Sequence, residues 1–198
     1  MHIKIVDNFL ESSDLELLIE FINKSRRVDK NGLSINKIED LELVKKLNNT
    51  YHIKVMNILQ QLFPQKVELY DYTQFALIET GSNFKFPIHD DDPNKILSGV
   101  VYIQPQKNIG TKFYSNKKGD VLEIVEWKIN RAVFFSRKER ISWHSYEGDG
   151  KNNRIALVYN LMTKNIKKVY EIENKNYFLG LLRWKINPYL YRFFKIII

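Results

Sequence analysis

The chain of 198 residues contains no cysteine. This absence excludes disulfide bridges, thiolate zinc sites, iron–sulfur clusters and cysteine nucleophiles. Any metal site must therefore be built from histidine, aspartate, glutamate or backbone oxygen. The phosphate-binding loops GxGxxG and GxxxxGK[ST] are absent as well, and so are internal repeats and low-complexity segments.

Long apolar runs are also lacking. No uninterrupted apolar run approaches the roughly 20 residues that a bilayer-spanning helix requires, and the N-terminal residues contain no apolar region of a secretory signal. We therefore expect a cytoplasmic protein. Hydrophobic residues make up 44% of the chain and charged residues 27%, which is typical of a globular domain with one core.

The net charge of +8 is unevenly distributed. Residues 164–198 contain eight basic and two acidic residues, so this segment carries six of the eight net positive charges. After Pro188, apolar residues recur at helical spacing, and they are Leu190, Phe193, Phe194 and Ile197. We expect this segment to pack on the domain or on a second copy, in a monomer or homodimer. Two alternatives are contact with an anionic membrane surface and direct contact with nucleic acid.

The order of the expected elements indicates the fold class. Helical spacing of apolar residues predicts one helix after Ser12 or Ser13 and a second from about Ile38 to Leu62, separated by a loop over 29–36. Eight short β-rich runs follow, at 66–70, 72–78, 96–104, 112–114, 121–125, 132–136, 141–146 and 155–161. Two helices followed by about eight strands predict a mainly β protein with N-terminal helices, an antiparallel sandwich or small barrel.

Two of the four histidines have neighbours that indicate a metal site. His89 begins the run His89-Asp90-Asp91-Asp92. In a strand, residues two apart point to the same side, so His89 and Asp91 share one face while Asp90 and Asp92 point away. One imidazole and one carboxylate, joined by a second imidazole from elsewhere, make the facial triad that binds iron(II) and leaves coordination positions open. His144 is the natural second imidazole.

Arg154 completes the expected site. It lies ten residues after His144, at the start of a predicted strand. A guanidinium inside a small barrel requires an anionic partner, because burying it alone is very costly. A dicarboxylate that chelates the metal with one end would present its other carboxylate to Arg154 for a bidentate contact.

These residues resemble the 2-oxoglutarate- and Fe(II)-dependent oxygenases, in particular the prolyl 4-hydroxylase-like branch. The similarity rests on His89-x-Asp91, the distal His144 and Arg154 ten residues later. It extends over residues 3–163, through segments 75–89, 97–103, 109–113 and 130–135. It implies a double-stranded β-helix, or jelly roll, in a domain over 1–163, with helical support over about 9–63 and a β core over about 66–163. Residues 164–198 form a C-terminal extension.

The resemblance also implies a function. The chain would be a dioxygenase that uses Fe(II), 2-oxoglutarate and O2, with ascorbate as a candidate reductant. His89, Asp91 and His144 would hold the metal, and Arg154 with Tyr102 would hold the far carboxylate of 2-oxoglutarate. Peptidyl proline or another protein side chain is the first candidate substrate, and a small molecule or sugar is the second. The tyrosine that the family places about ten residues before the first histidine is replaced here by Ile78 or Glu79.

Other functions remain open. The aspartate run could be a solvated acidic turn, or it could hold a hard cation such as calcium. The whole chain could be a catalytically inactive jelly roll that binds a polyanion or a protein partner. A nucleic-acid substrate is not expected, because alkylation-repair relatives carry a second arginine at the position of Asn160.

Overall fold

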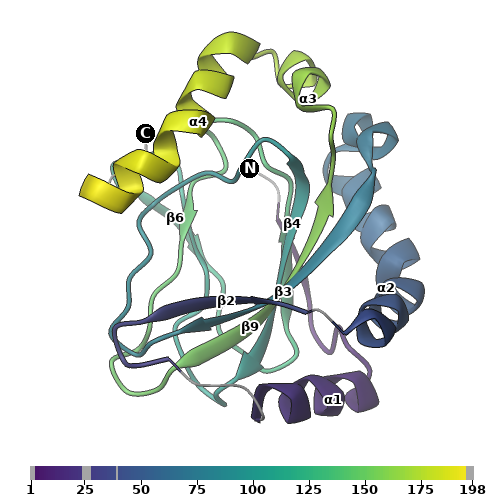
Figure 1. Cartoon of the computed structure of the whole chain (residues 1–198), viewed down its shortest axis with the longest axis vertical. Helices are drawn as coiled ribbons and strands as arrows, with labels where there is room; N and C mark the ends of the chain where they lie inside the picture. The colour runs from purple at the N-terminus through teal and green to yellow at the C-terminus, as the bar shows by residue number, and fades with distance from the viewer. Residues whose placement is uncertain (1–2, 24–27, 39, 195–198) are drawn as a thin grey trace.

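The computed structural model describes residues 3–23, 28–38 and 40–194, which form two antiparallel sheets with helices packed around them (Figure 1). The helical elements are α1 (Ser12–Asn23), α2 (Leu41–Leu62), the 3-10 helix η1 (Pro64–Leu69), α3 (Ile166–Ile172) and α4 (Tyr177–Phe194). The strands are β1 (Ile3–Val6), β2 (Leu33–Lys37), β3 (Tyr72–Thr80), β4 (Lys95–Gln104), β5 (Lys112–Tyr114), β6 (Val121–Ile124), β7 (Ala132–Phe135), β8 (His144–Ser145) and β9 (Arg154–Met162).

The strand order is that of a jelly roll. The larger sheet has the order β1-β7-β4-β9-β3-β2, and the smaller sheet has the order β6-β5-β8. All strand pairs are antiparallel, and β9 pairs with β3 over its whole length in the larger sheet. The predicted fold class, β strands with N-terminal helices, is therefore confirmed.

The two faces of the larger sheet serve different purposes, because side chains alternate along each strand. On β9, Ile155, Leu157, Tyr159 and Leu161 belong to the main hydrophobic core, which also contains side chains of α1 and α2. The intervening residues, Arg154, Ala156, Val158 and Asn160, line a cavity on the other face, between the two sheets. One strand thus contributes both to the core and to the candidate site.

The two N-terminal helices cover the outer face of the larger sheet. α2 begins at Asp40, whose side chain accepts a hydrogen bond from the backbone N–H of Leu43 and so caps the helix. Leu47, Val55 and Leu59 of α2 are buried in the main core with strand residues. The apolar stripe of α2 therefore packs against the sheet, as its helical spacing in the sequence predicts.

Three expected elements differ from the structure. The strand expected at 66–70 is wrong, because Pro64 starts a 3-10 helix and Lys66 turns inward. The loop expected over 29–36 is wrong in its second half, because Leu33–Lys37 forms the edge strand β2 and takes its backbone partners from β3. The strand expected at 141–146 is reduced to His144–Ser145, because a turn with Arg140 at positive φ precedes it.

The basic C-terminal segment contacts the rest of the chain. Glu173, which directly follows α3, is buried and lies 2.8 Å from Nζ of Lys66 and 2.7 Å from Nη1 of Arg137. Arg183 of α4 forms ion pairs with Asp90 and Glu139. The boundary at residue 163 stays a prediction, but α3 and α4 are both joined to the β core by buried charge pairs. Within the described ranges, no helix is both long and apolar enough to cross a membrane.

Candidate metal centre

His89 and His144 are brought together by backbone pairing. The backbone N–H of His89 donates to the carbonyl of His144 at 3.0 Å, and that of His144 donates to the carbonyl of His89 at 2.9 Å. The two residues form an isolated antiparallel bridge, which places their side chains side by side. The centroids of the two imidazole rings are 4.2 Å apart.

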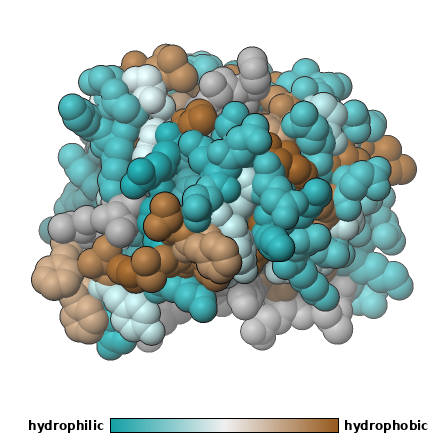
Figure 2. Space-filling view, turned by 90° about the horizontal axis from the view of Figure 1, so that it is seen from above, coloured by the Kyte–Doolittle hydropathy of each residue, from teal (hydrophilic) through white to brown (hydrophobic). Residues whose placement is uncertain are grey.

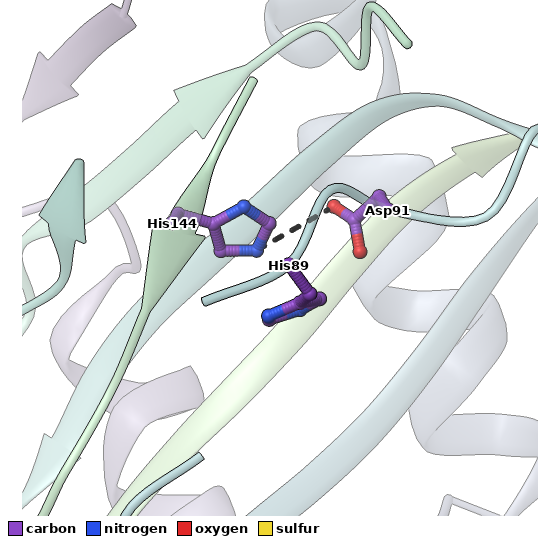
Figure 3. Close-up of side chains that lie close together, drawn as sticks. All are labelled: His89, Asp91 and His144. Carbon is purple, nitrogen blue, oxygen red and sulfur yellow. Dashed lines mark ion pairs between the residues drawn. The ribbon is translucent and has the colours of Figure 1, made fainter. Parts of the chain in front are cut away.

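Asp91 joins the two imidazoles to make a group with the spacing of metal ligands. One donor atom each from His89, Asp91 and His144 lies within 4.8 Å of the others. Nε2 of His144 is 3.9 Å from Oδ2 of Asp91, and Figure 3 shows the three side chains converging. The structure therefore brings together the three residues predicted as ligands, and their ligand role stays a prediction.

Backbone carbonyls orient both imidazoles. Nδ1 of His89 is 3.0 Å from the carbonyl oxygen of Pro87, and Nδ1 of His144 is 2.9 Å from that of Ser142. A proton on each Nδ1 would make these hydrogen bonds and leave each Nε2 with a free lone pair. This is the usual support for a metal-binding histidine. Burial and the neighbouring His144 lower the pKa of His89 to about 3, so its imidazole is neutral at pH 7.

Asp91 is held by two polar neighbours that sequence reasoning missed. Lys95 lies 2.6 Å from Oδ1 of Asp91, and the hydroxyl of Ser98 donates to Oδ2. Burial alone would raise the pKa of Asp91, but the Lys95 ammonium and the two imidazoles hold it below its usual range. A turn closed by the N–H of Lys95 and the carbonyl of Asp92 places the lysine here. The sequence alone did not indicate that Lys95, four residues after Asp91, would contact its carboxylate.

The neighbours of Asp91 have other partners, although residues 90–92 form no strand and only His89 is in a β-bridge. The carboxylate of Asp90 forms an ion pair with Arg183 of α4 and accepts the N–H of Arg140 at 2.8 Å. Asp92 as a residue is exposed, but its carboxyl accepts a hydrogen bond from Trp184 of α4 and burial raises its pKa. Neither residue is part of the His89, Asp91 and His144 group.

A cavity of about 80 Å³ adjoins the triad, between the two sheets. It is lined by Asp91, Lys95 and His144 and, from the larger sheet, by Arg154 and Thr80. A single water needs roughly 10–15 Å³ of such space. The cavity therefore accommodates a small polar molecule and is too small for a folded partner.

Arg154 is buried in this cavity without an acidic partner among the described residues. Its guanidinium lies over the rings of Trp127 and Tyr146, at 5.1 and 5.0 Å from their centroids. Its Nε has no hydrogen-bond partner, and burial lowers its pKa. A buried cation in this state is costly unless an anion occupies the space next to it.

Two further positions were predicted to matter for 2-oxoglutarate: Tyr102, and the position of Ile78 or Glu79 where the family has a tyrosine. The hydroxyl of Tyr102 donates to Oγ1 of Thr111 and accepts the Thr111 N–H, both at 2.9 Å, so it contacts the cavity through Thr111. Its predicted contact with 2-oxoglutarate stays a prediction. Where the family tyrosine is missing, Ile78 and Thr80 line the cavity, whereas Glu79 accepts a hydrogen bond from Asn153.

Comparison with known proteins gives matches of structure and not of sequence. No family model matches the chain, and neither does any curated protein. A prolyl-4-hydroxylase from Pseudomonas putida superposes with a TM-score of 0.60 at 14% identity, covering 82% of this chain and 93% of that one. A prolyl hydroxylase from Trichoplax adhaerens, in complex with a peptide fragment of hypoxia-inducible factor, has a TM-score of 0.60 at 17% identity over 84% and 86%.

A third similar structure comes from a virus. The collagen prolyl hydroxylase of Paramecium bursaria Chlorella virus-1, described as a 2-oxoglutarate complex, has a TM-score of 0.59 at 13% identity and covers 82% of this chain and 96% of that one. At these identities the similarity establishes the fold. The chain thus has the jelly-roll fold of the prolyl 4-hydroxylase-like 2-oxoglutarate oxygenases.

Proposed function

We propose that this chain is an Fe(II)- and 2-oxoglutarate-dependent dioxygenase. One observation carries the proposal: Asp91 and His144, which form a group of metal-ligand spacing with His89, border the same small cavity as a buried guanidinium, Arg154, that has no acidic partner in the described part of the chain. A metal alone would not require Arg154, and an anion alone would not require the triad. A dicarboxylate co-substrate bound beside a metal uses both.

The donor set fits iron(II). Two imidazoles and one carboxylate occupy one face of the ion and leave the other positions for co-substrate and oxygen. The absence of cysteine and the presence of one carboxylate in the group argue against a structural zinc site and against calcium. When bound, iron(II) and 2-oxoglutarate supply oxygen activation, in which decarboxylation of the co-substrate to succinate is coupled to hydroxylation of a substrate C–H bond.

The chain's own residues would bind, orient and exclude water. Arg154 would grip the far carboxylate, and the hydroxyl of Thr80, which is buried without a hydrogen-bond partner, would donate to it. Tyr102 would support this contact by fixing Thr111 at the cavity wall. Apolar walls such as Phe135 and Val158 keep bulk water from the reacting atoms.

A protein side chain is the proposed substrate, with peptidyl proline first, and a small molecule or sugar second. Similarity of fold to prolyl hydroxylases supports this order, and one of those neighbours is described with a bound peptide. The cavity itself, at about 80 Å³, is too small for a peptide. The substrate would therefore approach from the surface beside the triad and insert one side chain.

The test measures Fe(II) binding and 2-oxoglutarate turnover in the same protein. We expect binding of one Fe(II) per chain, loss of binding in His144→Ala, and Fe(II)-dependent conversion of 2-oxoglutarate to succinate even without substrate, at a slow rate. A chain that binds no Fe(II) and consumes no 2-oxoglutarate would instead support the inactive jelly-roll binding module. Candidate proline peptides are then compared by the rise in succinate formation.

A further inference from the structure

The outer face of α4 is apolar and exposed. Phe178, Leu182, Tyr189 and Phe193 lie on one side of the helix, because they follow one another at intervals of four, seven and four residues. Their exposed fractions are 78%, 57%, 67% and 68%. Figure 2 looks down on this side of the molecule and shows a band of hydrophobic side chains between hydrophilic ones. Within the single chain the domain therefore leaves Phe193 uncovered, and the expected packing of this segment on the domain or on a second copy stays a prediction; Ile197 of the same stripe lies outside the described residues.

The opposite face of the same helix is fixed to the β core. Arg183 pairs with Asp90, next to the candidate ligand Asp91, and with Glu139 at 3.5 Å. The ring of Tyr191 lies 5.6 Å from that of Phe86, which in turn contacts His89 at 4.6 Å. Near the start of α4, Gly180 is pressed against Tyr170 so closely that a Cβ would not fit. The body of the protein thus holds α4 in place and presents its apolar face outward.

Basic residues border this face and acidic residues are missing from it. The sequence from Asn174 to Ile198 contains no aspartate or glutamate. Lys185 and Arg192, both exposed, lie beside the apolar residues on α4. An apolar stripe bordered by cations is complementary to a surface that offers hydrocarbon below a layer of negative charge.

From these observations we propose that α4 docks the protein on an anionic lipid surface, in the plane of the interface. The helix would insert Phe178, Leu182 and Phe193 between headgroups, while Lys185 and Arg192 contact lipid phosphates and carboxylates. A second copy fits this face less well, because two antiparallel α4 helices would bring like charges together. Nucleic acid fits less well, because exposed leucine and phenylalanine gain little from phosphates. α4 does not qualify as a membrane-crossing helix, which agrees with binding at the surface.

Docking through α4 does not depend on the proposed dioxygenase activity, but it would determine where the candidate metal centre lies relative to the membrane. The residues facing the metal centre and those facing the lipid lie on opposite sides of one helix, whose diameter is about 10 Å. A docked protein would therefore hold its candidate metal centre close to the membrane surface.

The experiment measures co-sedimentation of the full-length chain with vesicles. The vesicles contain phosphatidylcholine alone or phosphatidylcholine with phosphatidylserine, in low and high salt. We expect binding to the anionic vesicles in low salt, and little binding to the neutral ones. Raising the salt to about 1 M should weaken it strongly, because screening shortens the range of charge attraction to about 3 Å.

Two double variants and a matched control identify the face. Lys185→Glu/Arg192→Glu should lower the vesicle affinity by at least about 20-fold, and Leu182→Ser/Phe193→Ser should lower it to a similar extent. The control, Lys45→Glu/Lys107→Glu, makes the same change of net charge at exposed positions away from α4, and should lose far less. The melting temperatures of all three variants should match that of the unaltered protein, because every altered side chain, polar or apolar, is exposed to solvent.

Three results would overturn the proposal. The first is absence of binding to anionic vesicles in low salt. The second is an equal loss of binding in the Lys185→Glu/Arg192→Glu variant and in the control, which would mean that net charge alone is responsible. The third is a dimer in light scattering that Leu182→Ser/Phe193→Ser dissociates, which would show that a second copy covers this face.

Discussion

Thr80 and Arg154 are directly opposite each other on β3 and β9, and both line the cavity beside the candidate metal centre. Each has a buried side-chain atom without a hydrogen-bond partner, Oγ1 of Thr80 and Nε of Arg154. One cross-strand pair therefore offers a cation and a hydroxyl to the same small space. Together they make a site that suits a carboxylate.

Removal of the guanidinium should affect the co-substrate and spare the metal. Arg154→Ala should weaken 2-oxoglutarate binding by about 2–5 kcal/mol, because a buried charge-assisted contact is lost. Titration calorimetry with Fe(II), followed by 2-oxoglutarate, separates the two affinities. Thr80→Val should cost less, about 0.5–1.5 kcal/mol, because only a hydroxyl is lost. Unchanged 2-oxoglutarate affinity in Arg154→Ala would contradict the assignment.

Alanine substitutions across residues 89–92 should separate ligands from neighbours. His89→Ala and Asp91→Ala should lose more Fe(II) affinity than the roughly 10–100-fold typical of changes to outer partners. Asp92→Ala is the matched control, because this carboxyl directly follows Asp91 but lies outside the group of three candidate ligands, so its loss should leave the affinity nearly intact. The three dissociation constants are compared at one pH. Dependence on Asp92 with tolerance at Asp91 would mean that the alternation of side chains is shifted by one residue.

Alkaline pH should destabilise the fold through buried tyrosines. Burial raises the pKa of Tyr159 and Tyr102 above the ordinary value of 10.0. The unfolded chain then loses these protons at lower pH than the folded chain, so the contribution of these tyrosines to the free energy of unfolding is constant below about pH 10 and falls as the pH rises further. Urea unfolding at a series of pH values measures this slope.

Tyr159→Phe provides the control for the alkaline effect. The Tyr159 hydroxyl is buried without a hydrogen-bond partner, which costs about 1–3 kcal/mol. The variant should therefore be at least as stable as the original at neutral pH and should lose less stability above pH 10. A marked loss of stability at neutral pH would show that the hydroxyl has a partner in solution.

The buried charges that join α3 to the core should be essential for stability. Glu173→Ala would leave Lys66 and Arg137 buried without their carboxylate, which costs about 3–5 kcal/mol. Glu171→Ala is the matched control, because Glu171 is exposed and its change should stay within about 0.5 kcal/mol. Equal melting temperatures of the two variants would mean that residues beyond 163 contribute little to the fold.

Side-chain alternation made much of this site predictable. Because the period of a strand is two, the order of residues predicted that His89 and Asp91 share a face and that Asp90 points away; the structure groups them in this way although residues 90–92 form no strand. The same alternation separates the core residues of β9 from the cavity residues. The apolar stripe of α2 likewise predicted a helix that ends at Leu62, where Pro64 follows.

The elements that sequence reasoning missed are short or depend on distant partners. β2 is a five-residue edge strand in which only Leu33 and Ile35 alternate with polar residues, too short a pattern to predict a strand, and β3 supplies its backbone partners. η1 forms where Lys66 turns inward to Glu173, more than one hundred residues away in the chain. Local sequence periodicity does not predict such contacts, because the residues around one partner give no information about the other.

The sequence by itself determined which residue types could carry chemistry: with no cysteine and few histidines, His89, Asp91, His144 and Arg154 were the candidates. Tertiary structure alone decided that His89 and His144 pair through their backbones, that Lys95 and Ser98 hold Asp91, and that Arg154 has no acidic partner among the described residues. It also decided that α4 presents its apolar face to solvent. The physical reason is that burial, pairing and exposure are properties of neighbours in space, which the order of residues does not specify.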